Sequence, residues 1–181
     1  MKSLEERVRR LEACEDIRSL AARYTFAVDN RDLKAIAACF SEHARFRSKD
    51  GVLNAVGRDA IMAQFDARFL VLGPGAHYTH DHVVWFEKSN LSIARGLVSS
   101  HAELIRNGRP MITSLRYDDE YIVEDEKWVF SDRLLSFFYY LETGDYLKYL
   151  GDKKRMRAYD EPWDADFPEA LASWRKYHPS D

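Results

Sequence analysis

The sequence predicts a single α+β domain in which N-terminal helices pack on one face of a curved antiparallel sheet and enclose a pocket with it. Apolar residues recur at helical spacing through much of the first 70 residues, and four strand-like runs follow them. Short polar turns separate these runs, as expected of neighbouring antiparallel strands. Segregation of helices from strands is typical of α+β domains, and 181 residues suffice for one such domain with a sizeable core.

The first helix is expected from Leu4 to about Val28. Its apolar residues follow one another at steps of three and four, which marks one face of a helix. These residues are Val8, Leu11, Cys14, Ile17, Leu20, Tyr24 and Ala27. The segment DNRD interrupts the pattern, and its last aspartate, Asp32, is the expected N-cap of a second helix that carries Ile36 and Phe40.

The pair Asp50-Gly51 predicts a tight turn between two short strands. Ile61, Phe65 and Phe69 then have the spacing of a third helix. The four strand-like runs come next, at about 76–87, 91–106, 110–124 and 127–141, with the segments EKSN, NGRP and EDEK between them.

The segment 142–181 is expected to be a C-terminal extension of a domain that covers 1–141. It is polar, yet it contains large apolar and aromatic residues that an unstructured tail rarely has. They are Met156, Tyr159, Trp163, Phe167, Leu171 and Trp174. We therefore expect the extension to pack, either over the pocket mouth or on a neighbouring subunit.

Composition excludes several classes of function. Lysine and arginine (27) are outnumbered by aspartate and glutamate (30), so no nucleic-acid partner is expected. The sequence has no signal peptide and no long apolar run, which favours a cytoplasmic protein that does not act at a membrane. Cys14 and Cys39 lack CxxC spacing and are expected to be reduced thiols. Dinucleotide, P-loop, GxSxG and HExxH motifs are missing, so no cofactor is expected.

The stretch GPGAHYTHDHVVWFE contains three histidines, and imidazole serves both as a metal ligand and as a general base near neutral pH. A metal is one alternative, since His80-x-His82 followed by Glu87 is similar to half of a cupin motif. However, the odd spacing of His80 and Glu87 puts them on opposite faces of a regular strand, and after His101 no histidine occurs before the C-terminal extension. No metal is therefore expected. In a regular strand His77 also faces away from His80 and His82, unless a bulge intervenes, and structural or interface roles for the latter two stay open.

Three segments carry a family resemblance: YTFAVDNRD on the first helix, HYTHDHVVWF on the first long strand and EDEKWVFSDR on the last. Together, over about residues 4–141, they resemble the SnoaL-like branch of the NTF2-like superfamily. Within it they are most similar to hexachlorocyclohexane dehydrochlorinases and bile-acid 7α-dehydratases, with scytalone dehydratases more distant. The resemblance implies a cystatin-like cone, a hydrophobic small-molecule substrate, no cofactor, and a homodimer or homotrimer built through the open face of the sheet.

The resemblance assigns catalytic roles to four residues. Asp29 orients His77, the base that removes a proton from carbon, while Tyr24 and Arg133 assist at the oxyanion or the leaving group. Such chemistry needs a neutral base whose tautomer a second group fixes, and an arginine stays charged beside a departing anion. Core or surface roles for Tyr24 and Arg133 remain as alternatives.

Further candidates for the substrate pocket lie on the first two long strands: Tyr78, His80, Ser99 and His101. The bile-acid dehydratases place a functional carboxylate on the second of these strands, near the position of Ser100 or His101. This chain lacks that carboxylate, so bile-acid dehydration is not expected.

The sequence thus predicts a cofactor-independent lyase, of dehydratase or dehydrohalogenase type, or an isomerase, in which a His–Asp dyad removes a proton from a hydrophobic cyclic molecule. Cyclisation of the polyketide-cyclase type is a related possibility. The alternative is a non-catalytic NTF2-like ligand-binding or assembly subunit, similar to the β subunits of ring-hydroxylating dioxygenases. A subunit of that kind has no need of the Asp29–His77 pair.

Overall fold

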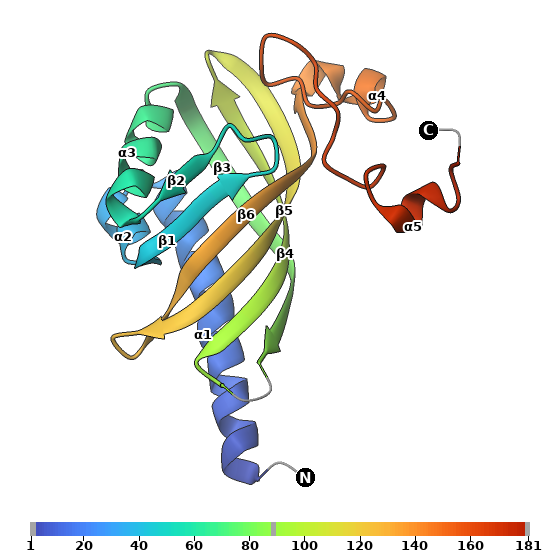
Figure 1. Ribbon diagram of the computed structural model, residues 1–181. Coiled ribbons are helices and arrows are strands. Elements are labelled where there is room, and N and C mark those ends of the chain that lie inside the picture. The colour runs from blue at the N-terminus through green and yellow to red at the C-terminus, as the bar shows by residue number, and fades with distance from the viewer. Residues whose placement is uncertain (1–2, 88–89, 180–181) are drawn as a thin grey trace.

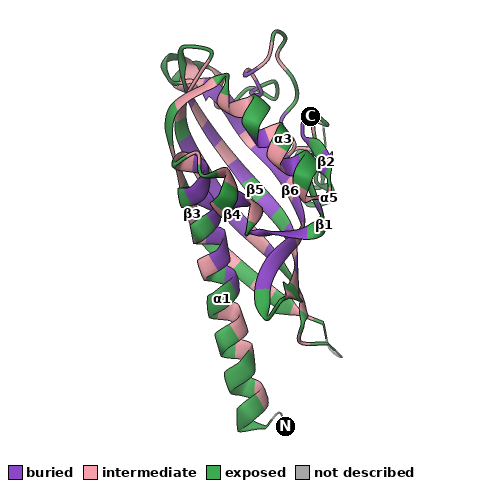
Figure 2. Ribbon diagram, turned by 90° about the vertical axis from the view of Figure 1, so that its left-hand side faces the viewer, coloured by how far each residue is buried: buried purple, intermediate pink, exposed green. Residues whose placement is uncertain are grey.

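A long N-terminal helix lies along one face of a curved six-stranded sheet (Figure 1). The computed structural model describes residues 3–87 and 90–179. Helix α1 spans Leu4–Asp29, and the Ser3 side chain caps it by accepting a hydrogen bond from the backbone N–H of Glu6 at 3.1 Å. The C-terminal half of α1 packs on the sheet, whereas its first two turns extend past the sheet with their large apolar residues exposed (Figure 2). The predicted first helix is confirmed.

Two shorter helices, α2 (Leu33–Ala37) and α3 (Arg58–Phe69), lie beside the first two strands (Figure 1). Asp32 caps α2 as predicted, since its side chain accepts a hydrogen bond from a backbone N–H at 2.9 Å. Phe40 was expected on this helix but begins the first strand instead. Its backbone pairs with Phe130, far along the chain, and such a long-range pairing leaves no trace in local periodicity.

The sheet has the strand order β2-β1-β6-β5-β4-β3. The strands are β1 (Phe40–Ser48), β2 (Asn54–Val56), β3 (Leu72–Phe86), β4 (Ile93–Arg106), β5 (Arg109–Glu124) and β6 (Lys127–Glu142). The four long strands form the predicted antiparallel meander, although the turn predicted at 87–90 lies partly outside the described residues. Strand β1 pairs with β6 in parallel, so the sheet is mixed rather than wholly antiparallel. The predicted turn at Asp50-Gly51 joins β1 and β2, with Gly51 at φ +77°.

The core lies between α1 and the concave face of the sheet. Alternate residues of β4 and β5 point to this face and are buried, as the two-residue period of a strand requires. From α1 they meet one helical stripe of buried residues, namely Ile17, Leu20, Ala21, Tyr24, Ala27 and Val28. These two matched patterns produce the predicted α+β architecture. No helix in the described ranges is long and apolar enough to cross a bilayer.

The C-terminal extension follows β6 and runs back along the end of the sheet (Figure 1). It contains the short helices η1 (Thr143–Asp145), α4 (Tyr146–Tyr149) and α5 (Ala172–Arg175). Its buried anchor is Arg155, which donates to the carbonyl of Phe138 at 2.6 Å and forms an ion pair with Glu169 at 2.6 Å. Whether the extension caps the pocket mouth or a neighbouring subunit stays a prediction.

Candidate active site

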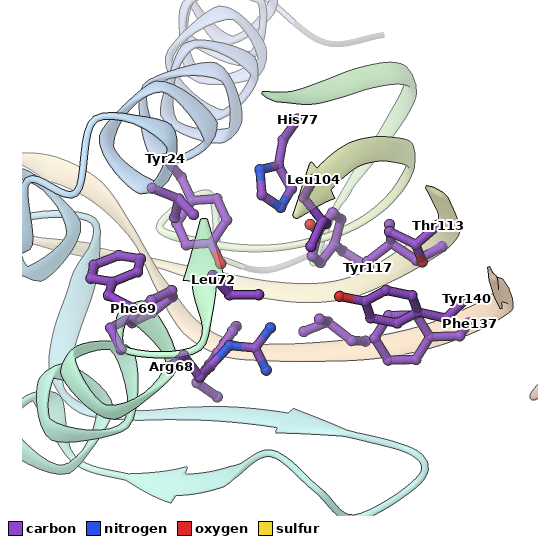
Figure 3. Close-up of a pocket in the computed structure, with 15 residues that line it drawn as sticks. Tyr24, Arg68, Phe69, Leu72, His77, Leu104, Thr113, Tyr117, Phe137 and Tyr140 are labelled. Atoms are coloured by element: carbon purple, nitrogen blue, oxygen red, sulfur yellow. The ribbon is translucent and has the colours of Figure 1, made fainter. Parts of the chain in front are cut away.

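A pocket lies between α1, α3 and the concave face of the sheet (Figure 3). Its lining is mainly aromatic and aliphatic: Tyr24, Val28, Phe46, Phe65, Arg68, Phe69, Leu72, His77, Leu104, Thr113, Leu115, Tyr117, Leu135, Phe137 and Tyr140. The cavity volume is about 50 Å³, which holds a few water molecules. A cyclic ligand therefore enters only when some of these side chains move.

The His77 imidazole reaches this pocket from β3 (Figure 3). Asp29, the last residue of α1, holds it in place. The Nδ1 atom of His77 lies 2.6 Å from Oδ1 of Asp29, and the backbone N–H of His77 donates to Oδ2 at 2.9 Å. An ionised carboxylate only accepts hydrogen bonds, so this contact places the imidazole proton on Nδ1. The other ring nitrogen, Nε2, is then left with a free lone pair.

A β-bulge decides which histidines face inward. Thr79 pairs with Ser100 and His82 pairs with Val98, so β3 carries one extra residue over this interval. His77 and His82 are five residues apart and would face opposite sides of a regular strand. Because of the bulge both lie on the concave face.

His82 begins a chain of polar contacts beneath the pocket. Its Nε2 atom lies 3.0 Å from the hydroxyl of Tyr121, which in turn donates to Asp119 at 2.9 Å. Since the single hydroxyl proton goes to Asp119, Nε2 of His82 is the donor in the first contact. Burial, together with the charges of Arg133 and Arg18, lowers the pKa of His82 to about 4. His82 is thus neutral at physiological pH.

Arg133 lies in the core, behind the pocket. Its Nε and Nη2 atoms donate to Asp119 at 3.0 and 3.1 Å, and neither side chain is exposed, at 0% each. Burial by itself lowers the pKa of Arg133, but Asp119 and the neighbouring tyrosines Tyr117, Tyr24 and Tyr121 together outweigh this and raise the pKa overall. The guanidinium carbon lies 3.9 Å from the ring centroid of Tyr117 and 4.3 Å from that of Tyr24, within cation–π distance. Arg133 is not among the residues that line the pocket.

Tyr24 separates Arg133 from the pocket. Its ring packs on the guanidinium, and its hydroxyl side lines the cavity (Figure 3). Burial above all raises the pKa of Tyr24, with a further contribution from Tyr117, so the phenol stays protonated. The hydroxyl has no hydrogen bond within residues 3–87 and 90–179, which leaves it available as a donor to a ligand.

Four residues expected at the pocket lie instead on the opposite face of the sheet. Tyr78 pairs with His101 across β3 and β4, and their rings stack at a centroid distance of 4.8 Å. His80 stacks on His101 from the other side, also at 4.8 Å, and Ser99 accepts the backbone N–H of Asp81. The two-residue alternation of a strand turns these side chains away from the pocket that His77 enters. The bulge also places His80 and His82 on opposite faces of the sheet. The two histidines therefore cannot act as the paired ligands that the cupin-like alternative requires.

Sequence reasoning missed three polar residues of the pocket: Arg68, Tyr117 and Tyr140. Arg68 follows Ile61 and Phe65 at helical spacing, so the same apolar stripe could have placed it on the inner face of α3. The hydroxyls of Tyr117 and Tyr140 come from the central strands, where alternate residues point inward. Thr113 also lines the pocket, but its hydroxyl donates to the carbonyl of Tyr139 at 2.8 Å.

Comparison with known proteins identifies relatives of this fold. A model of the SnoaL-like domain matches residues 9–134. A candidate scytalone dehydratase from Novosphingobium aromaticivorans has a TM-score of 0.68 at 18% identity, over 74% of this chain and 89% of that one. Hexachlorocyclohexane dehydrochlorinase LinA-type3 from Novosphingobium barchaimii has a TM-score of 0.66 at 17% identity, over 75% and 92%.

A third solved structure, Rv3472 of Mycobacterium tuberculosis, is a protein of unknown function. It has a TM-score of 0.62 at 25% identity, over 80% of each chain. No curated protein sequence matches the chain. These likenesses describe a shared fold, and the chemistry has to be argued from the pocket itself.

Proposed function

This chain belongs to the SnoaL-like domain family, and on that premise we propose that it is a cofactor-independent lyase or isomerase acting on a hydrophobic cyclic molecule. Dehydration or dehydrohalogenation is the leading reaction. The observation that carries the proposal is the two-point contact of Asp29 with His77 at the wall of an aromatic pocket. In this proposal the imidazole carries its proton on Nδ1, and the lone pair of Nε2 is the base beside the space that a substrate would fill.

Each step follows from the groups present. Nε2 of His77 takes a proton from a carbon of the substrate, and the carboxylate of Asp29 stabilises the imidazolium that forms. The protonated hydroxyl of Tyr24 donates a hydrogen bond to the carbonyl or hydroxyl oxygen on which charge develops. Loss of a halide as an anion, or of the hydroxyl as water after it takes the proton from the His77 imidazolium, completes an elimination. Return of the proton to another carbon completes an isomerisation.

Arg133 acts through Tyr24 in this proposal. Because its guanidinium is paired with Asp119 and packed on the Tyr24 ring, it cannot reach a departing anion without a rearrangement of the core. Its charge opposes the rise in the pKa of Tyr24 that burial produces, which makes the phenol a stronger hydrogen-bond donor. We therefore assign Arg133 as a positioning residue.

The test is a screen in D2O against hydrophobic cyclic β-hydroxy ketones, β-halo ketones and β,γ-unsaturated ketones, followed by mass spectrometry. Elimination appears as loss of water or halide, and isomerisation appears as deuterium uptake without loss. For any substrate found, His77→Gln is expected to lower kcat by about 100- to 10,000-fold, the usual contribution of a general base. His43→Gln, at an exposed position on β1, is the control and should keep full activity.

If the His77→Gln variant turns over the substrate as fast as the wild type, the Asp29–His77 dyad has no part in the mechanism. Saturable binding of these compounds with no turnover by the wild type would favour the non-catalytic ligand-binding alternative.

A further inference from the structure

Arg68 brings a positive charge to the pocket that no carboxylate neutralises. It comes from the last turn of α3 and lines the cavity, and its guanidinium points inward (Figure 3). Within residues 3–87 and 90–179 its side chain has no ion pair and no hydrogen bond. Arg133, which lies behind the pocket, differs because Asp119 neutralises it.

The rest of the lining cannot supply the missing negative charge. It contains no aspartate or glutamate, and both oxygens of Asp29 are already bound to His77. Burial raises the pKa of Tyr24, of Tyr117 and of Tyr140, so these phenols stay neutral. A charge in such an apolar space is costly unless a ligand pairs with it.

A second arginine lies near Tyr140. The guanidinium of Arg106, at the end of β4, is 6.0 Å from the ring centroid of Tyr140 and 5.5 Å from that of Tyr159. Its buried Nε atom has no hydrogen-bond partner among the described residues. Arg68 and Arg106 both oppose the rise in the pKa of Tyr140, so both charges act on this phenol.

His77 and Arg68 enter the pocket from opposite walls, one from β3 and the other from α3 (Figure 3). We infer that the substrate carries a carboxylate, and that Arg68 binds this group while the reacting carbon lies at His77. A guanidinium matches the planar carboxylate with two parallel N–H donors. The inference rests on the proposed function and narrows its substrate class to hydrophobic cyclic acids, with Arg68 as a specificity-determining residue.

The test compares each acid with its uncharged amide: 2-naphthoate with 2-naphthamide, and benzoate with benzamide. Isothermal titration calorimetry of the full-length protein at pH 7.5 and low salt gives the affinities. In the wild type the acids should bind about 10- to 100-fold more tightly than the amides, as expected for a charged hydrogen-bonded pair. Arg68→Gln should abolish this preference, and Arg68→Lys should retain part of it because the charge stays while the fork is lost.

The control is Arg95→Gln, which removes the same charge from an exposed position on β4 and should keep the preference for acids. Equal affinity for acid and amide in the wild type overturns the inference, as does an unchanged preference in Arg68→Gln or no binding of either carboxylate. A loss of kcat in Arg68→Gln without a change in acid binding also overturns it, because Arg68 would then act only in the transition state.

Repeating the titrations with His77→Gln separates this inference from the proposed function. If the protein prefers acids but turns over no compound, the proposed enzymatic function is wrong and the proposed carboxylate site at Arg68 is supported. If turnover depends on His77 but the protein shows no preference for acids, the proposed enzymatic function is supported and the proposed carboxylate site at Arg68 is wrong.

Discussion

Asp29 accepts two hydrogen bonds from one residue, and the pair of contacts controls both the position and the tautomer of His77. The backbone N–H fixes the start of the inner segment of β3 against the end of α1. The Nδ1 contact then determines which ring nitrogen carries the proton. An anion at a helix C-terminus opposes the macrodipole, so Asp29 is not explained by the stability of α1 alone.

Asp29→Asn tests this control directly. Asparagine replaces one of the two carboxylate oxygens with an NH2 donor, so only one of the two positions that contact His77 can still accept a hydrogen bond. Either the strand contact is lost, or the imidazole proton moves to Nε2 and the base disappears. We expect kcat to fall by about 100- to 10,000-fold, measured on the reaction that the screen identifies. Asp32→Asn is the matched control, since asparagine is an equally good N-cap for α2; full activity of Asp29→Asn would contradict the assignment.

His82 makes stability depend on pH. The pKa of His82 is about 4 in the folded protein and about 6.5 in an unfolded chain. Unfolding therefore takes up a proton between these values, and the free energy of unfolding falls as pH drops from about 6.5 to about 4. Burial and the positive charges of Arg133 and Arg18 disfavour the second ring proton of His82 in the folded protein.

The measurement is the unfolding temperature of wild type and His82→Gln between pH 4 and 8. The difference between the two curves should change across pH 4 to 6.5 and stay constant above it. His43→Gln, at an exposed site, should follow the wild type. Parallel curves for wild type and His82→Gln would show that His82 does not carry this dependence.

At the scale of single elements, the inner face of β3 depends on its bulge and on the glycine opposite. Val84 pairs with Gly96 on β4. A Cβ atom at Gly96 would lie 2.9 Å from the Tyr121 hydroxyl and 3.1 Å from Nε2 of His82. The polar chain beneath the pocket therefore needs a residue without a side chain at this position.

Gly96→Ala should destabilise the fold by about 1–3 kcal/mol, the usual cost of overpacking a core. The unfolding temperature would fall by about 2–4 °C for each kcal/mol in a chain of this size. Gly144→Ala is the control, because a Cβ at Gly144 meets nothing within 4 Å. A Gly96→Ala protein as stable as the wild type would mean that the Tyr121 ring moves aside freely.

Local patterns predict the elements well, and the exceptions have a common cause. The helical stripe of α1, the N-cap at Asp32 and the Asp50-Gly51 turn depend on neighbours in sequence and are confirmed. The parallel pairing of β1 with β6 and the bulge in β3 depend on partner strands. They therefore cannot be predicted from the local periodicity of the sequence. The bulge explains why strand alternation alone could not place both His77 and His82 on the concave face.

At the scale of the whole molecule, the pocket is closed more tightly than its proposed substrate allows. A cavity of about 50 Å³ cannot hold a cyclic acid, so binding requires movement of α3, of aromatic side chains or of the C-terminal extension. Tyr159 of that extension lies against Arg106, behind Tyr140 of the pocket wall. The sequence predicted that the extension packs, but its anchor is a buried ion pair whose two partners lie far apart in the polar segment.

That anchor gives the last prediction. Arg155 is 2% exposed, and its guanidinium binds Glu169 at 2.6 and 2.8 Å while also donating to the carbonyls of Asp152 and Phe167. Glu169→Gln removes the opposite charge from a buried arginine, which is strongly destabilising when nothing compensates. The carbonyl acceptors and the amide oxygen of the new glutamine still accept hydrogen bonds from Arg155. We therefore expect the free energy of unfolding to fall by about 1–3 kcal/mol. Faster limited proteolysis within 142–179 and a lower unfolding temperature would measure it.

Glu161→Gln is the matched control, since Glu161 is an exposed residue of the same extension. The two variants also separate local from global consequences. If the extension restricts entry to the pocket, Glu169→Gln should speed the association of 2-naphthoate while leaving the preference for acid over amide unchanged, because Arg68 belongs to α3. If Glu169→Gln unfolds the extension and association stays the same, the extension does not control entry, and the movement that admits the ligand lies in α3 or the aromatic walls.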